Sequence, residues 1–225
     1  MFIDFETHDA KYNMDFDEKL LKDCENNNID FALRLYAWDV PSISLGRNQK
    51  ILGINEEYCL ENNIPIVRRI TGGRALLHDD ELTYCVVCSK KILADGTNVI
   101  SDYKEISGIL IEALNKTGID AYYGEKTKSN IGAGYCMNLS TVCDINVNGK
   151  KFIGSAQFRS NTHILQHGSV PFSFNKEMLK EIFMGNVDFE HIIGLKEINP
   201  DFDVQKFKNQ LKLSFEEHFN KVSHD

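Results

Sequence analysis

The dipeptide Asn148-Gly149 is the feature of this 225-residue sequence that most constrains its fold. It separates two segments of strand character, CDINV before it and KKFIGSAQF after it. Asn-Gly is a preferred centre for a two-residue β-turn, because both turn positions require positive φ. The sequence therefore predicts an antiparallel hairpin here, and at least part of the sheet must be antiparallel.

Strand and helix signals follow one another irregularly along the rest of the chain. Alternating apolar residues predict strands, and apolar residues at helical spacing predict helices. Asn13 and Ser101 are expected to cap the first two helices, and Gly118 to end the second. The absence of regular βαβ alternation predicts an α+β fold, with a mixed or antiparallel central sheet flanked by helices. Strands are expected at 31–38, 42–46, 65–70, 82–88 and 163–174, and helices at 13–25, 102–117 and 204–220.

Length and composition are those of one globular domain. A chain of 225 residues that is 42% hydrophobic can bury a core of its own, so we expect residues 1–225 to form a single domain. No stretch approaches the roughly 18 consecutive apolar residues of a membrane helix, and the acidic N-terminus lacks the features of a signal peptide. We therefore expect a cytoplasmic protein without membrane attachment, whose six cysteines are thiols rather than disulfides.

Charge is unevenly distributed along the chain. The net charge of -8 makes the protein a poor general binder of nucleic acid. Residues 1–40 carry ten acidic and four basic residues, whereas residues 121–175 carry five basic residues against Glu125 and Asp144. The second segment is either solvated surface or a positive site for an anionic ligand or an acidic partner. Its basic residues are Lys126, Lys128, Lys150, Lys151 and Arg159.

Candidate ligand-binding residues are most concentrated in residues 67–87, VRRITGGRALLHDDELTYCVV. The paired glycines Gly72 and Gly73 have no Cβ and allow a ligand to approach the backbone closely. Arg68, Arg69 and Arg74 offer forked donors that suit a phosphate or a carboxylate. The segment matches neither the dinucleotide-binding nor the P-loop motif. On these residues alone, a structural turn and an anion-binding loop are equally good interpretations.

RRITGGRALLHDDELTY resembles the characteristic motif of the lipoate-protein ligase A and octanoyltransferase family, which shares its fold with biotin-protein ligases. Three other segments are similar to that family in order and spacing, and together they cover residues 2 to 175. They are FIDFETHDAKYNMDFDEKLL, RLYAWDVPSISLGRNQ and NVNGKKFIGSAQFRSNTHILQHGSV. The resemblance implies a catalytic domain that places an octanoyl or lipoyl group on a lysine of a small carrier domain. It also implies an acyl-binding set made of Arg69, Thr71, Gly72, Gly73, Arg74, His78, Gly154, Ser155, Ala156 and His167.

Two catalytic residues follow from the same resemblance. Lys151 matches the lysine that the family places beside the acyl carbonyl, where an ammonium stabilises the developing oxyanion. Cys136 precedes Gly149-Lys150-Lys151 at the interval at which LipM-type octanoyltransferases carry their nucleophilic cysteine. A thiolate at this position would attack a thioester and form an acyl-enzyme. Without the motif, Lys151 would be interpreted as a solvated hairpin lysine and Cys136 as a packed thiol.

The remaining candidate residues have structural explanations. Cys143 is expected to pack in a strand, and Cys85 and Cys88 lie three apart in an apparent strand, so they should point to opposite faces. No second pair of ligands has the spacing of a zinc site, so no metal is expected. His78 and His167 are expected to contact the acyl donor or to be structural histidines, and neither is assigned a catalytic role.

Several functions remain open at this point. The resemblance favours octanoyl transfer from acyl carrier protein, without metal or nucleotide cofactor, to a lipoyl carrier domain such as the glycine cleavage H protein. The alternatives are an ATP-dependent lipoate ligase acting through lipoyl-AMP, an amidotransferase between two lipoyl domains, and a catalytically silent acyl-protein binding module. Many ligases of the family carry a third glycine where this chain has Arg74, and they add a C-terminal accessory domain that we do not expect here. A monomer is the default expectation.

Overall fold

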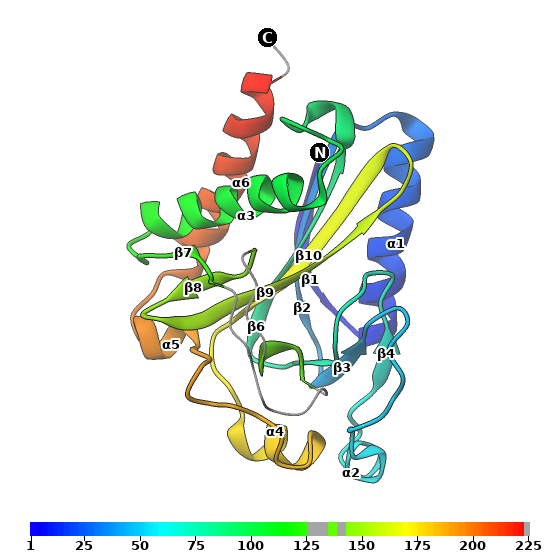
Figure 1. The fold of residues 1–225 in the computed structure, drawn as a ribbon, viewed down its shortest axis with the longest axis vertical. Helices are drawn as coiled ribbons and strands as arrows, with labels where there is room; N and C mark the ends of the chain where they lie inside the picture. Colours follow the sequence, from blue (N-terminus) through cyan, green and yellow to red (C-terminus); the bar gives the residue numbers. More distant parts are fainter. Residues whose placement is uncertain (126–134, 139–142, 223–225) are drawn as a thin grey trace.

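The computed structural model describes residues 1–125, 135–138 and 143–222. Its centre is a seven-stranded sheet in the order β1-β2-β6-β10-β9-β8-β7 (Figure 1). β1 pairs with β2 in parallel, and every other pair in this sheet is antiparallel. The predicted mixed sheet is therefore confirmed. The strands are β1 (Phe2–His8), β2 (Phe31–Trp38), β6 (Glu81–Ser89), β7 (Tyr122–Tyr123), β8 (Ile145–Val147), β9 (Lys150–Arg159) and β10 (His163–Pro171).

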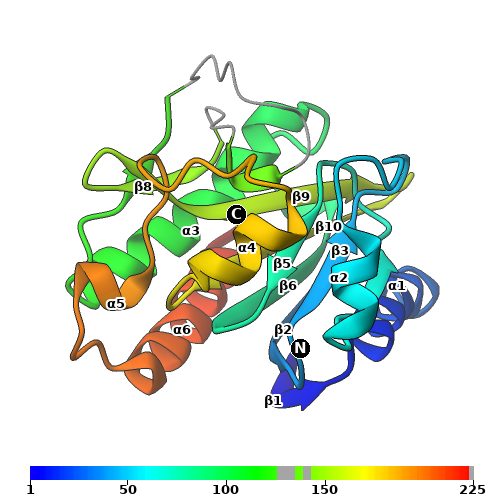
Figure 2. The same cartoon turned by 90° about the horizontal axis from the view of Figure 1, so that it is seen from below.

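A second, three-stranded sheet lies beside the first. Its order is β4 (Ile66–Arg68), β3 (Ser42–Leu45), β5 (Leu76–His78), with β3 parallel to β4 and antiparallel to β5. The glycine turn of the sequence connects β4 to β5, so it lies at the end of this small sheet. Figure 2 shows β3 and β5 near the short helices α2 (Glu56–Glu61) and α4 (Lys176–Ile182), with which they share a hydrophobic core.

Helices cover both faces of the large sheet, as expected for an α+β fold. α1 (Ala10–Asn27) packs on one face, in a core that includes Tyr36 and Leu165. α3 (Val99–Lys116) and α6 (Val204–Val222) pack on the other face, around Leu35 and Phe152. Figure 1 shows α1 on the opposite side of the sheet from α3 and α6. The remaining short elements are η1 (Lys90–Ile92), η2 (Cys136–Asn138) and α5 (Leu195–Ile198).

The hairpin predicted from Asn148-Gly149 is confirmed. Both residues have positive φ, 51° and 74°, and they connect β8 to β9. The pairing of these two strands is irregular, because Ile145 faces Ile153 whereas Asn146 faces Lys151. This irregularity is a bulge, a feature that redirects side chains locally. It lies at Lys151, the residue that the sequence assigns to catalysis.

The predicted N-terminal caps of two helices were wrong. α1 is capped by Asp9, whose carboxylate accepts from the Tyr12 amide, whereas Asn13 lies inside the helix and is fully buried. Its side-chain amide donates to carbonyls of His8 and Ala37, which ties the helix to β2 instead of capping it. The second error is at α3, which begins earlier than predicted and is capped by Asn98 rather than Ser101. The cause is the same in both cases: an Asp or Asn side chain earlier in the sequence accepts hydrogen bonds from the free amides of the first turn, so the helix begins there.

Two other local predictions agree with the structure. Gly118 follows the end of α3 with a φ of 92°, as a C-terminal glycine should. Cys85 belongs to the core under α1 and Cys88 to the core under α3, so the two thiols point to opposite faces of β6. Within the described parts of the chain, no helix has the length and hydropathy needed to cross a membrane.

Candidate active site

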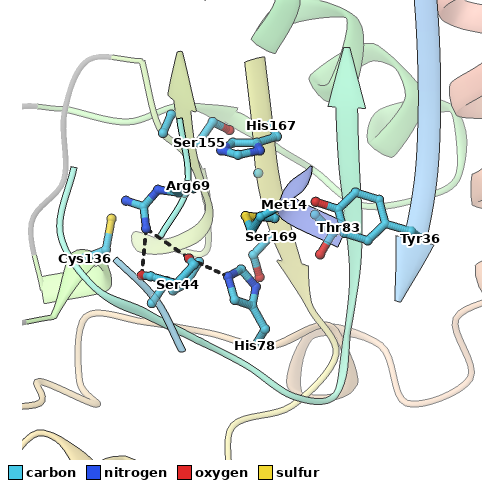
Figure 3. Close-up of a pocket in the computed structure, with 14 residues that line it drawn as sticks. Met14, Tyr36, Ser44, Arg69, His78, Thr83, Cys136, Ser155, His167 and Ser169 are labelled. Carbon is cyan, nitrogen blue, oxygen red and sulfur yellow. Dashed lines mark hydrogen bonds between the residues drawn. The ribbon is translucent and has the colours of Figure 1, made fainter. Parts of the chain in front are cut away.

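A pocket opens where the small sheet meets β6, β9 and β10. Side chains of Ser44, Thr83 and Ser169 make its wall polar, whereas Met14 and Leu76 make it apolar elsewhere. In Figure 3, Cys136 and Tyr36 lie at opposite sides of the pocket. The predicted site residues that line it are Arg69, His78, Cys136, Gly154, Ser155, Ala156 and His167. The predicted residues outside its lining are Lys151, Thr71, Gly72, Gly73 and Arg74.

The glycine turn is required by a close approach of two parts of the backbone. Gly73 has a φ of 96°, and a Cβ added to it would lie 2.8 Å from a guanidinium nitrogen of Arg69. A Cβ added to Gly46 would lie only 2.0 Å from the Gly73 carbonyl oxygen. The turn therefore depends on glycine at both positions. Gly46 lies in the family-like block RLYAWDVPSISLGRNQ, where only its contact with Gly73 explains the need for a glycine.

Arg69 is a structural residue of the pocket wall. Its Nε donates to the Thr71 hydroxyl, one terminal nitrogen donates to the carbonyl and hydroxyl of Ser44, and the other donates to the carbonyls of Gly72 and Arg74. These five bonds use every N–H of the guanidinium. Arg69 therefore has no N–H left for an anionic ligand, and of the two interpretations that the sequence left open, its hydrogen bonds fit the structural turn. Its hydrogen bonds to the carbonyls of Gly72 and Arg74 hold the glycine turn in place.

Arg68 is engaged in a similar way. One terminal nitrogen donates to the carbonyls of Gly46, Arg47 and Gln49. Those carbonyls belong to the loop after β3, so Arg68 fastens this loop to β4. Of the three arginines that the sequence placed around the turn, two bind the protein itself.

His167 connects the turn to α1. Its Nε2 lies 2.7 Å from the Thr71 hydroxyl, and its Nδ1 lies 2.9 Å from a carboxylate oxygen of Asp17. Burial lowers the pKa of His167, so the imidazole is neutral at pH 7. A neutral ring that donates from Nδ1 to Asp17 must accept at Nε2, which makes Thr71 the donor of the second bond.

Asp17 is a buried carboxylate that the sequence analysis did not identify. Burial alone would raise its pKa, but hydrogen bonds from His167 and the Tyr36 hydroxyl and the charge of Arg34 outweigh burial and hold the pKa of Asp17 below its usual value. Arg34 donates to the carboxylate at 2.9 Å, and both side chains are almost fully buried. Asp17 lies at a helical position whose burial could be inferred only from the packing of α1 on β2.

His78 has a matching arrangement on the other side of the pocket. Its Nε2 lies 2.8 Å from the Ser44 hydroxyl, and its Nδ1 lies 2.9 Å from Glu81. Glu81 also accepts from the hydroxyls of Thr83 and Ser169 at 2.5 Å each. Burial alone would raise the pKa of Glu81, but the charge and hydrogen bond of His78 and the two hydroxyls outweigh burial and lower it.

The two histidine networks meet at Arg69, which donates to both Ser44 and Thr71. A continuous chain of hydrogen bonds therefore crosses the pocket wall from one carboxylate to the other. Part of this chain is drawn in Figure 3. Because each polar group has a partner, the wall has a defined shape and its charges are balanced by Arg34 and Arg69. In order, its members are Glu81, His78, Ser44, Arg69, Thr71, His167 and Asp17.

Cys136 differs from the other cysteines in exposure. It is partly exposed and lines the pocket, and its amide donates to the Ala75 carbonyl at 2.8 Å. Cys143 is buried, but it lies in a turn before β8 rather than in the strand that we predicted. The five other thiols are buried, and burial raises the pKa of each: Cys24 (to about 11), Cys59, Cys85, Cys88 and Cys143.

Lys151 lies against the segment that carries Cys136. Its Nζ is 3.4 Å from the Cys136 carbonyl oxygen and 3.1 Å from a carboxylate oxygen of Asp144. The side chains of Lys151 and Asp144 are each only 4% exposed. The structure thus places a buried ammonium beside the main chain of Cys136. Asp144 is another buried carboxylate, and in the sequence it is distinguished only by its charge.

Gly154 makes room for the lysine side chain behind the pocket. A Cβ added there would lie 3.0 Å from the Met137 sulfur and 3.3 Å from Lys151 Cε. Gly154 itself lines the pocket. The glycine therefore brings the lysine stem, the Cys136 segment and the pocket wall into contact.

Two described cations of the basic segment, Lys151 and Arg159, pair with buried carboxylates. Lys151 is buried with Asp144, and Arg159 donates at 2.6 Å to Asp102, a fully buried carboxylate of α3. Lys126 and Lys128 lie outside the described residues. Across the described ranges, no three His, Cys, Asp or Glu side chains are grouped as they would be to hold a metal.

Comparison with known proteins agrees with this architecture. The model of the lipoyl protein ligase A/B catalytic domain family matches residues 9–216. The chain belongs to this family. The octanoyltransferase LipM of Oceanobacillus iheyensis is 35% identical over 188 residues, which are 83% of this chain and 69% of that protein. LipM of an Exiguobacterium species is 36% identical over 183 residues, covering 76% of this chain and 65% of that protein. The chain thus spans about two thirds of the length of these relatives.

Solved structures of the family share the fold. A lipoate-protein ligase A bound with ATP superimposes with a TM-score of 0.79 at 22% identity, over 97% of this chain and 85% of that one. The archaeal bi-partite lipoate protein ligase of Thermoplasma acidophilum, described with its E2 lipoyl domain, gives 0.77 at 19% identity, over 97% and 82%. At these identities the likeness establishes the fold of the lipoyl ligase family and not the reaction.

Proposed function

We propose that this protein is an octanoyltransferase that moves an octanoyl group from acyl carrier protein to a lysine of a lipoyl carrier domain, in lipoate biosynthesis. The observation that carries the proposal is the position of Cys136, a partly exposed thiol at a pocket that Met14 also lines and whose opposite side is formed by Tyr36 (Figure 3). A group held there as a thioester would point its acyl chain into the pocket. The LipM relatives at 35% and 36% identity support the same reaction.

The reaction divides into two acyl transfers. The Cys136 thiolate attacks the carbonyl carbon of the donor thioester, the C–S bond to the donor breaks, and the donor sulfur leaves and takes a proton. The neutral amine of the acceptor lysine then attacks the octanoyl-cysteine carbonyl. Amide formation releases the Cys136 thiolate together with one proton. In both steps an oxyanion forms near the cysteine, where the Lys151 ammonium would stabilise it.

The pocket lining determines how the acyl chain is held. Ser155, Ala156 and the histidines His78 and His167 lie in the wall, whereas Thr71, Gly72 and Gly73 shape it from behind through Arg69 and His167. The acceptor would be a lipoyl domain such as the glycine cleavage H protein, in line with the E2 lipoyl domain of the archaeal ligase system. None of these steps uses a nucleotide or a metal.

Intact-mass spectrometry tests the proposal. The protein is incubated with octanoyl-acyl carrier protein without ATP, and we expect a mass increase of one octanoyl group that is absent from Cys136→Ser. Cys143→Ser is the matched control, because it removes a buried thiol close in sequence and should keep the adduct. If carrier modification requires ATP and free acid, and no adduct forms on the enzyme, the protein is a ligase instead. A lipoyl adduct from a lipoylated domain, without reaction of octanoyl-acyl carrier protein, would indicate the amidotransferase.

A further inference from the structure

Arg74 differs from the other two arginines of the glycine turn. One of its terminal nitrogens is buried and has no hydrogen-bond partner in the described part of the protein. No carboxylate of these residues forms an ion pair with it, whereas Arg68 donates to three carbonyls and Arg69 uses all five N–H groups. A buried guanidinium N–H without an acceptor is unfavourable, so its persistence calls for an explanation.

The backbone holds Arg74 next to the nucleophile. Its carbonyl accepts from Arg69 at 2.8 Å, and the carbonyl of the next residue, Ala75, accepts from the Cys136 amide at 2.8 Å. Ala75 also forms a parallel bridge with Tyr135. The main chain on both sides of Arg74 is therefore fixed beside the Cys136 segment. Its side chain, in contrast, does not line the acyl pocket.

The position and the unpartnered terminal nitrogen together indicate a ligand that reaches Cys136 from outside the acyl pocket. An arginine side chain whose N–H groups lack an acceptor suits a phosphate or carboxylate, to which a guanidinium can form two parallel bonds. Under the proposed function, the group that enters with the thioester is a phosphopantetheine arm, and its phosphate is the anion common to every such donor. Among the described residues, two other cations near the Cys136 segment already have partners: Lys151 pairs with Asp144, and Arg69 donates to the glycine turn and Ser44.

We propose that Arg74 binds the phosphate of the phosphopantetheine thioester donor and so selects donors that carry this arm. The proposal rests on the proposed function, because it requires a thioester donor. It gives Arg74 a role within substrate binding that differs from that of the residues lining the acyl pocket. It assigns acyl recognition to the pocket and recognition of the donor arm to the end of the glycine turn.

The test compares three donors in the acylation of Cys136, followed by mass. Octanoyl-acyl carrier protein and octanoyl-coenzyme A both carry the phosphopantetheine phosphate, whereas octanoyl-N-acetylcysteamine has the same thioester without it. We expect Arg74→Gln to raise KM roughly 10- to 100-fold for the two phosphate donors, the scale of a lost charge-assisted bond. KM for the N-acetylcysteamine thioester should stay within about twofold of the wild type, the scatter expected for a substitution that removes no contact with that donor.

Two further variants keep the result interpretable. Arg74→Lys retains the charge without the fork and should lie between the wild type and Arg74→Gln. Lys150→Gln is the matched control, because it removes one nearby charge from the hairpin turn and should leave KM unchanged for all three donors. Equal melting temperatures for the variants and the wild type would exclude loss of folding.

The outcomes separate this proposal from the proposed function. A phosphate-dependent loss supports the role of Arg74. Unchanged KM with every donor, an equal loss with all three, or a loss confined to acyl carrier protein would overturn it, while acylation of the wild-type cysteine would still stand. If no thioester acylates the wild-type enzyme, the proposed function itself is refuted.

Discussion

The buried ion pair between Lys151 and Asp144 should contribute measurably to the stability of the fold. Both side chains are 4% exposed and their charged atoms are 3.1 Å apart. Replacing Asp144 by Asn removes the negative charge, keeps the shape, and leaves the ammonium buried without this counter-charge. Removing one partner of such a pair typically costs about 3 to 5 kcal/mol. We expect the Asp144→Asn variant to lie near 3 kcal/mol, because the amide oxygen still accepts a hydrogen bond.

Urea unfolding measures this loss directly, and thermal unfolding should show it as a fall in Tm of roughly 6 to 12 °C. The double variant Asp144→Asn/Lys151→Met should recover much of the stability, because a neutral pair avoids the unpaired charge. A double-mutant cycle should therefore give a coupling free energy of about 2 kcal/mol or more. Asp23→Asn is the matched control, since its partner Lys19 is exposed on α1, and it should not change stability measurably.

The same variant should slow acyl transfer. Lys151 Nζ contacts the Cys136 carbonyl, and Asp144 fixes it there. We expect Asp144→Asn to reduce kcat for octanoyl transfer with little change in KM for the donor, and Asp144→Glu to restore part of the rate. A coupling free energy near zero, or an unchanged kcat, would refute the role assigned to this pair.

Two further predictions concern the pocket. Met14 lines the pocket, so Met14→Ala should enlarge it and shift the preferred acyl chain from octanoyl towards decanoyl. We expect roughly a fourfold change in kcat/KM per added CH2 if each buries about 0.8 kcal/mol. An unchanged chain-length profile would contradict a role of Met14 in setting the chain length. Burial lowers the pKa of His167, so the unfolded chain binds a proton below about pH 6.5 that the folded protein does not, and stability should fall as pH drops from 7 to 5. In urea unfolding at several pH values, His167→Gln should flatten this fall, whereas an identical pH slope in the variant would show that the histidine does not contribute.

Much of the local structure could be predicted from the sequence. Asn148-Gly149 determines its own turn, because few residues adopt positive φ easily, and Gly118 ends α3 for the same reason. The central strands were also located correctly, since alternation of apolar residues needs only neighbouring positions to be compared. Helix starts were less certain, because several Asp, Asn and Ser residues near one end compete to cap the same amides.

The candidate site was predictable only in part. The motif resemblance pointed to Cys136 and Lys151, and the structure brings them into contact without testing their roles. The buried carboxylates Asp17, Glu81 and Asp144 were not identified. Each lies far in sequence from at least one of its partners or across a bulged hairpin, and no local pattern distinguishes a buried carboxylate from a solvated one.

The sequence by itself therefore determined the fold class, the hairpin and the segments that meet at the pocket. The tertiary structure alone decided what each charge does. Arg69 and Arg74 are five residues apart on one turn, yet the first is enclosed by carbonyls and hydroxyls and the second keeps a donor free. Hydrogen-bond satisfaction depends on atoms brought together from distant parts of the chain, and composition and spacing do not contain that information.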